Sequence, residues 1–302
     1  MHNPQKLANY GFFQILAIGG IWLLICLGVI GWYLSDIVQF IYRVCQSSWD
    51  VFVQHLTMSN HLILPMIILA VLARGLYLLG MRLWRTHRFT KTLLRQQIPN
   101  SNKLITLAQQ AGISPQTIIC IQSDVIRAFS VGIWAPKIWV STGLLSLLDD
   151  DELIAVLQHE AHHCQKRDPL RLFITRLICD IFFFIPRLGS LSDYNHLAQE
   201  MAADEAAVNL LGDNLPLASA LHKLLTCRQS PSTVPKLAIS QLNITERRIL
   251  ALVSPQVNVG WQSTLANWSG SIILAIILFG VLFLTDPFIQ QTITPCVLEA
   301  SI

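Results

Sequence analysis

An uncharged apolar stretch near the amino terminus constrains the fold of this chain more than any other feature. Residues 12–34 read FFQILAIGGIWLLICLGVIGWYL and include no charged side chain. A helix needs about 20 apolar residues to cross the hydrocarbon core of a bilayer, whereas a signal peptide has a shorter apolar core and a small-residue cleavage site. Residues 12–34 are therefore predicted to form an uncleaved membrane-spanning helix.

Two more apolar stretches extend this prediction. Residues 61–80 read HLILPMIILAVLARGLYLLG, and residues 268–284 read WSGSIILAIILFGVLFL. Arg74 lies near one end of the first of these, where its long side chain can reach the interface. Only 13% of the residues are charged, against about 25% in ordinary soluble domains. We therefore expect a polytopic membrane protein with an anchor over residues 1–81, a polar domain over residues 82–266, and the third span with a short tail over residues 267–302.

Basic residues beside the second span predict the orientation of the chain. Five of them follow it with no acidic residue in between: Arg82, Arg85, Arg88, Lys91 and Arg95. The loop over residues 35–60 has one arginine against two aspartates, and the tail over residues 286–302 has no Lys or Arg. Because basic residues near span ends stay inside, the polar domain is predicted to be cytoplasmic. The net charge is only +3 and no basic stripe interleaved with aromatics is present, so no nucleic-acid partner is expected.

The polar domain is predicted to be mainly α-helical with one small sheet. Residues 116–141 are rich in β-branched and aromatic residues, which favours short strands. Asp149 and Glu152 form a capping-box pattern at the start of a helix over residues 150–166, and Asp168 before Pro169 is expected to cap the next helix. The other helices are expected at residues 82–112, 192–211, 216–227 and 244–253. Residues 170–188 are expected to pack on the domain or at the membrane face, with a fourth crossing as the alternative.

The helix over residues 150–166 carries the sequence HEAHH. His159 and His163 are four residues apart and therefore share one face of that helix, so each can direct a ring nitrogen at a single ion. Glu160 can reach a water molecule beside that ion. A histidine pair on a helix can equally be a surface or core feature, and catalytic zinc needs a third protein ligand.

A third ligand is available in AQEMAADEAA, residues 198–207. Glu200 and Asp204 lie on one face of the predicted helix, and Ala203 and Ala207 beside them would allow a close approach to the HEAHH helix. His196, one turn earlier on that face, is the alternative ligand. His162 lies about 100° around its helix from His163 and is expected to point away.

The run KIWVSTGLLSLLDDDELIAVLQHEAHH followed by EMAAD resembles the integral-membrane zinc metallopeptidases of the BlaR/MecR type, and more distantly the HtpX-like and CAAX-prenyl membrane proteases. The similarity covers about residues 115–250. It implies a zincin-like (gluzincin) α+β domain in which zinc is bound by His159, His163 and Glu200. It also implies that Glu160 is the general base and that Asp204 orients a ligand histidine. The lengths of the two side chains agree with these roles. The longer Glu200 can reach across to a metal, whereas the shorter Asp204 suits a hydrogen bond to a ligand histidine.

The resemblance implies a membrane-anchored zinc endopeptidase in the bacterial inner (plasma) membrane that cleaves a cytosolic or juxtamembrane protein. A transcriptional repressor and damaged membrane proteins are the two substrate classes to consider. The strand at residues 137–141 is expected to align the substrate by edge pairing, and Tyr194, His222 and Arg127 are equal candidates for the oxyanion donor. The beta-lactam sensors carry a penicillin-binding domain after the last span, where only residues 286–302 follow here, so direct beta-lactam sensing is not expected. Those sensors are also expected to have three amino-terminal spans, which would require residues 37–56 to insert.

Two other functions remain as alternatives. A non-catalytic membrane signalling scaffold would be marked by loss of the base or of a ligand, and neither is lost. A site-2-type intramembrane protease would bury HExxH in a membrane helix and use a later Leu-Asp-Gly. Here the motif has charged flanks, and residues 211–213 read Leu-Gly-Asp.

Overall fold

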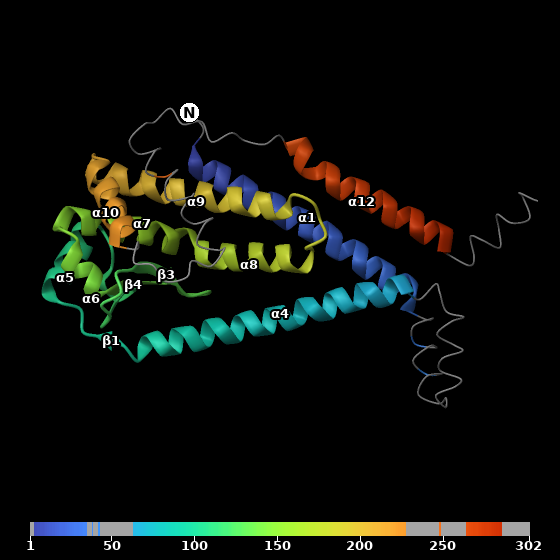
Figure 1. The fold of residues 1–302 in the computed structure, drawn as a ribbon, viewed down its shortest axis with the longest axis horizontal. Helices are drawn as coiled ribbons and strands as arrows, with labels where there is room; N and C mark the ends of the chain where they lie inside the picture. The colour runs from blue at the N-terminus through green and yellow to red at the C-terminus, as the bar shows by residue number, and fades with distance from the viewer. Residues whose placement is uncertain are drawn as a thin grey trace, which may run out of the picture. The chain divides into compact units, whose positions relative to one another are not determined.

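The computed structural model describes residues 3–34, 38, 42, 63–227, 248 and 264–285, and these are mostly helical with one small sheet, as expected (Figure 1). The elements in chain order are α1 (Pro4–Trp32), α4 (Ile63–Leu94), β1 (Gln97–Ile98), α5 (Asn102–Gln110), the 3-10 turn η2 (Pro115–Thr117), β2 (Ile118–Ile121), β3 (Ala128–Val131), β4 (Lys137–Ser141), α6 (Thr142–Leu147), α7 (Asp150–Lys166), α8 (Asp168–Ile181), α9 (Leu188–Leu211), α10 (Leu215–Cys227) and α12 (Thr264–Thr285).

Two helices within the described residues are long and apolar enough to cross a membrane, judged by length and composition. They are α1 and α4, which contain most of the two apolar stretches noted above. The third apolar stretch lies in α12, whose apolar part is the shorter run Ser269–Leu278. The second of the two stretches continues as one helix well past residue 80, to Leu94.

The chain divides into two compact units. One comprises Gln14–Gly80, Leu177–Gly189 and Gln262–Ile302. In it, Trp22 of α1 meets Phe184 edge to face, with ring centroids 5.8 Å apart. Arg74 of α4 donates a hydrogen bond to the carbonyl oxygen of Asp180 and lies 5.1 Å above the ring of Phe183. Arg74 therefore has partners in the last turn of α8 and in the segment that follows it.

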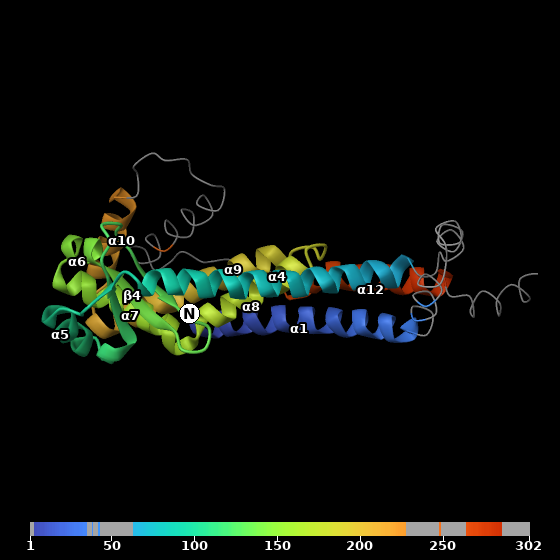
Figure 2. The same ribbon diagram turned by 90° about the horizontal axis from the view of Figure 1, so that it is seen from below.

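The other unit comprises Met1–Phe13, Met81–Arg176 and Ser190–Trp261 and contains the sheet. The strand order is β1-β2-β4-β3, with β2 and β4 parallel and the outer pairs antiparallel. One face packs on a core that includes Ile118, Ile138, Val140 and residues of α5 and α7. In Figure 2, β4 lies among α5, α6, α7 and α10, and α7 packs against β3 and β4.

The pairing corrects one sequence prediction. The strand over residues 137–141 is β4, and both of its edges are occupied, by β2 and by β3. It cannot add a substrate strand. The edge strand on that side of the sheet is β3.

The helix predicted over residues 82–112 is also corrected, because β1 interrupts it. The next residue, Pro99, disfavours helical backbone at Ile98. The side chain of Asn100 then accepts a hydrogen bond from the Cys120 amide and donates one to the Ile118 carbonyl, which holds the connection to β2. The second helical part, α5, ends just before Gly112, whose φ is +70°.

Helix α7 begins with the predicted capping box, in which Asp149 and Glu152 each bond to the other's backbone amide. Glu152 is only 3% exposed and also pairs with Lys223 of α10 at 2.6 Å. At the other end the chain turns at Arg167, whose φ is +53°. Asp168 does not precede α8 as a cap. It is the first residue of α8, and its carboxylate contacts His163 and Arg171 instead.

The length of α8 bears on whether residues 170–188 cross the membrane or pack on the domain or at the membrane face. Helix α8 has 14 residues, too few for the roughly 20 that a crossing needs, so a fourth span is not supported. Helix α9 starts earlier than the predicted residue 192 and ends before Gly212 as expected. The helix predicted over residues 244–253, apart from the helical Arg248, and the segment 37–56, apart from residues 38 and 42, lie outside the described residues.

Candidate metal centre

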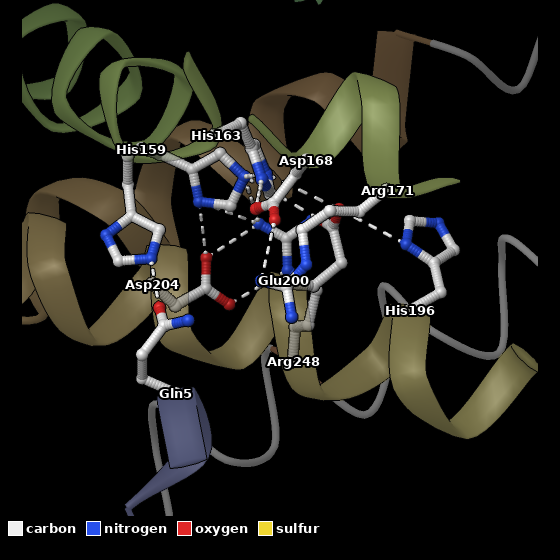
Figure 3. Close-up of polar contacts among 10 residues, drawn as sticks. Gln5, His159, His163, Asp168, Arg171, His196, Glu200, Asp204 and Arg248 are labelled. Atoms are coloured by element: carbon white, nitrogen blue, oxygen red, sulfur yellow. Dashed lines mark hydrogen bonds and ion pairs between the residues drawn. The ribbon is translucent and has the colours of Figure 1, made fainter. Parts of the chain in front are cut away.

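Three side chains from two helices converge beside the sheet. His159 and His163 of α7 direct their Nε2 atoms toward each other, 3.1 Å apart. Glu200 of α9 places its carboxylate oxygens 3.6 Å from Nε2 of His159 and 3.5 Å from Nε2 of His163 (Figure 3). Both histidines are buried. The three sequence-predicted metal ligands therefore lie within reach of one common point.

Small residues allow this approach of α9 to α7. Ala203 and Ala207 of α9 are fully buried, and Ala207 packs in one apolar cluster with Ala155 of α7. A side chain larger than methyl at the contact would push the helix axes apart, because protein interiors are close-packed. The AxxxA spacing in α9 thus sets the distance across which Glu200 has to reach.

The second nitrogen of each histidine meets a carboxylate. Nδ1 of His159 lies 2.9 Å from Oδ1 of Asp204, and Nδ1 of His163 lies 2.8 Å from Oδ2 of Asp168. A carboxylate accepts only an N–H, so each ring carries a proton on Nδ1, and Nε2 is the nitrogen left to bind a metal. Asp204 was expected in this role from the sequence. Asp168 was not, because its position before Pro169 pointed to helix capping.

The donor set fits a zinc ion. Zinc binds histidine nitrogen and carboxylate oxygen at about 2.0–2.2 Å in tetrahedral geometry, which separates neighbouring ligand atoms by about 3.3–3.5 Å. The two Nε2 atoms lie 3.1 Å apart, and each lies 3.5–3.6 Å from a different oxygen of Glu200, close to these separations. Among the described residues, these three form the group whose donor atoms could hold one metal ion.

Arg248 completes the cluster, and sequence reasoning did not single it out. Its guanidinium donates to both oxygens of Asp204, through Nε at 2.8 Å and Nη2 at 2.7 Å, and to Glu200 through Nη1 at 2.6 Å. Nη2 also lies 3.4 Å from Nε2 of His159. Arg248 lies 44 residues after Asp204, and it is one of two adjacent arginines, so nothing in the local pattern distinguished it.

Opposite charges in this cluster stabilise the ionised forms of Glu200 and His159. Burial would raise the pKa of Glu200, but Arg248 and the two histidines outweigh it and hold that pKa well below its usual value. Burial and Arg248 lower the pKa of His159, whereas its contacts with Asp204 and Glu200 raise it more, to about 9. A cation that binds at Nε2 of His159 therefore has to replace a proton, as is general for metal binding by histidine.

Three other candidate residues lie outside the group formed by His159, His163 and Glu200: Glu160, His162 and His196. Glu160 is half-buried on α7, and its charge raises the pKa of Arg248. His162 is buried and bonds to Gln5 of α1 at 2.8 Å, and burial lowers its pKa to about 4, so it is a neutral packing residue. Nδ1 of His196 lies 3.8 Å from Glu200, at the margin of the cluster in Figure 3. His196 is not in the metal-binding group of the described residues.

Comparison with known proteins identifies the family of this chain. A family profile described as BlaR1 peptidase M56 matches residues 39–252, well over half of the chain. The chain is 24% identical over 192 residues to the regulatory protein BlaR1 of Bacillus licheniformis, an alignment that covers 62% of this chain and 31% of that protein. It is 30% identical over 152 residues to a protease HtpX homolog of Acidiphilium cryptum, covering 39% of this chain and 53% of the homolog.

A protease HtpX homolog of Acaryochloris marina is 27% identical over 175 residues, covering 44% of this chain and 60% of the homolog. The chain thus spans less than two thirds of the length of each of these relatives. The matches confirm the resemblance to BlaR-type and HtpX-type membrane metallopeptidases that the motifs had indicated. This chain belongs to the BlaR1 peptidase M56 family.

Proposed function

We propose that this protein is a membrane-anchored zinc endopeptidase that cleaves a cytosolic or juxtamembrane protein. One observation carries the proposal: His159, His163 and Glu200 direct their donor atoms at one point, with both Nδ1 atoms already committed to carboxylates. Two histidines and one glutamate with an open fourth position form the ligand set of catalytic zinc in thermolysin and carboxypeptidase A.

In this proposal His159, His163 and Glu200 hold zinc, which when bound polarises the scissile carbonyl and activates water. Glu160 takes a proton from the attacking water as the water oxygen bonds to the carbonyl carbon. Glu160 then gives that proton to the amine nitrogen as the C–N bond breaks. Asp204 and Asp168 keep the two imidazole rings oriented throughout. The fixed rings reduce the reorganisation that the reaction needs.

The edge strand β3 is the element best placed to align a substrate. It packs against α7, which carries the motif, and within the described part of the chain no strand pairs with its outer side. A peptide added there would bond to the free backbone groups of residues 128–131. Of the three candidate oxyanion donors, Arg127 directly precedes this strand, whereas His222 lies exposed on α10 and Tyr194 belongs to α9.

The membrane setting and the substrate are parts of the same proposal. The basic residues of α4 favour a cytoplasmic catalytic domain, and the family favours a bacterial inner membrane. The word regulatory in the name of the B. licheniformis relative fits a signalling substrate such as a transcriptional repressor. The HtpX homologs, named as proteases, fit the removal of damaged membrane proteins equally well. The site-2 alternative is disfavoured because α7 starts with three acidic residues, Asp150, Asp151 and Glu152.

The substitution Glu160→Gln tests this function. It keeps the size of the side chain and the zinc ligands but removes the base, so cleavage is expected to fall by about 10²–10⁴-fold while zinc content stays unchanged. The measurement compares protein fragments in cells that carry the wild type or the variant, followed by cleavage of the identified substrate with purified protein. Glu205→Gln, an exposed change of the same kind on α9, serves as the matched control. A non-catalytic scaffold would instead give identical fragment patterns for wild type and Glu160→Gln.

A further inference from the structure

We propose that Asp168 and Arg171 are positioning residues that connect the ligand His163 to the first turns of the membrane helix α1. The inference rests on the proposed function, because it assumes that His163 binds zinc. It adds that the geometry of this ligand depends on how the start of α1 is docked on the catalytic unit. All of the residues involved belong to that one unit.

A continuous series of contacts carries the argument. Nδ1 of His163 donates to Oδ2 of Asp168 at 2.8 Å. The other oxygen of Asp168 accepts from Nη1 of Arg171 at 3.5 Å (Figure 3). Nη2 of Arg171 donates to the carbonyl oxygen of Ala8 in α1 at 3.1 Å. Three contacts thus join a backbone atom of α1 to a predicted zinc ligand.

Burial makes these contacts obligatory for Arg171. The residue is only 9% exposed, and Asp168 is only 6% exposed. A buried cation needs partners for its charge and its N–H groups. Those identified for Arg171 are Asp168, the Ala8 carbonyl and the ring of Phe12, over which the guanidinium lies at 4.7 Å. Two of the three belong to α1, so a displaced α1 would leave Arg171 without most of its partners.

One particular side of the first turns of α1 packs against the rest of this unit. Ala8, Gly11 and Phe12 lie three and four residues apart and therefore share one side of the helix. Ala8 is fully buried. A Cβ atom on Gly11 would lie 3.1 Å from Oδ1 of the buried Asn195 of α9, so the helix has little freedom to approach further. Gln5, one turn before, bonds to His162 of α7. The start of α1 is therefore held by α7, α8 and α9 together.

The same helix continues as one of the two candidate membrane spans. A sliding or rotation of α1 along its axis would move the Ala8 carbonyl and the Phe12 ring relative to Arg171. Asp168 would then lose its cation, and His163 would lose the fixed acceptor that orients its ring. A change sensed in the membrane can thus reach the metal ligand without any movement of α7 itself.

Zinc affinity is the first test, measured by competition with a chromophoric chelator on the full-length protein. Asp168→Asn and Arg171→Met are expected to weaken zinc binding by about 10–100-fold, the usual effect of losing a group that orients a ligand. Lys223→Met is the matched control, because it also removes the cation from a buried carboxylate on α7, Glu152, but at the other end of that helix. It should lower thermal stability and leave zinc affinity at wild-type level. Equal zinc affinity in Asp168→Asn, Arg171→Met and the wild type would overturn the inference.

Hydrogen exchange of residues 3–13 is the second test, and it does not depend on activity. Coupling between two sites is reciprocal, so zinc should slow amide exchange in the start of α1 in the wild type. Arg171→Met should abolish this protection. If zinc binds tightly but exchange in residues 3–13 does not respond, the connection to α1 is wrong although the proposed zinc site stands. If the wild type binds no zinc, the proposed function itself fails.

Discussion

At the scale of single residues, the two predicted histidine ligands have the same kind of support. Each Nδ1 atom bonds to an aspartate, and each aspartate contacts a buried arginine: His159 with Asp204 and Arg248, and His163 with Asp168 and Arg171. Asp168 is paired with Arg171, and three other carboxylates carry charge around the proposed metal: those of Glu200, Asp204 and Glu160, the last of which raises the pKa of Arg248. One arginine and one Zn²⁺ would balance their charge, which is a reason for Arg248 to stay when zinc binds.

Arg248→Met tests this charge balance. Asp204 is 4% exposed, and leaving a buried charge without its partner costs about 3–5 kcal/mol. We therefore expect a marked fall in the thermal stability of protein stripped with chelator. Arg248 also pairs with Glu200 at 2.6 Å, so zinc, which would pair with Glu200 in its place, should recover part of that loss. Arg247→Met makes the same change in net charge one position away and serves as the control. A stability loss of equal size with and without zinc would show that Arg248 is not part of the charge balance of the metal site.

The sequence could predict the residues of this site that share a helix face. His159 with His163, and Glu200 with Asp204, are each four apart, so local spacing alone brings each pair to one side. Arg248 could not be predicted, because it lies 44 residues after Asp204 and its contacts with α9 depend on tertiary structure. Asp168 could not be predicted as a partner of His163, because its reach depends on the left-handed turn at Arg167.

At the scale of the elements, the sequence predicted long helices well and sheet pairing poorly. Helix α7 and its capping box follow from local patterns. The division of residues 82–112 into α4, β1 and α5 was missed, because β1 has only two residues and exists through its pairing with β2. The substrate edge was assigned to β4 instead of β3, because strand order depends on contacts between distant segments.

The orientation predicted from the basic residues of α4 indicates which cysteines an impermeant thiol reagent can reach. Cys227, at the end of α10, is exposed and should be protected from the reagent in sealed cells and labelled after permeabilisation. Cys296, in the tail after α12, should be labelled from outside, as a single-cysteine variant. Cys164 is a poor probe, because burial and then the charges of Glu160 and Asp168 raise its pKa to about 12 and leave little reactive thiolate. Labelling of Cys227 in sealed cells would contradict a cytoplasmic catalytic domain.

At the scale of the whole molecule, the catalytic unit includes the first turns of a helix that continues as a candidate membrane span. Residues Met1–Phe13 at the start of that helix thus belong to the same unit as the predicted metal ligands. The family match covers both the motif helix and the segment that contains Arg248. Zinc at the point between α7 and α9 is the claim on which the catalytic function, the role of Asp168 and the role of Arg248 all depend.

The zinc content of purified variants tests that claim most directly. Wild-type protein should hold about one zinc ion per chain, and Glu200→Ala should lose it, because a third ligand is needed for tight binding. Asp204→Ala should bind zinc about 10–100-fold more weakly, since Asp204 acts through His159. His196→Ala should retain the metal. If zinc is instead lost from His196→Ala and kept in Glu200→Ala, the ligand set proposed here is wrong.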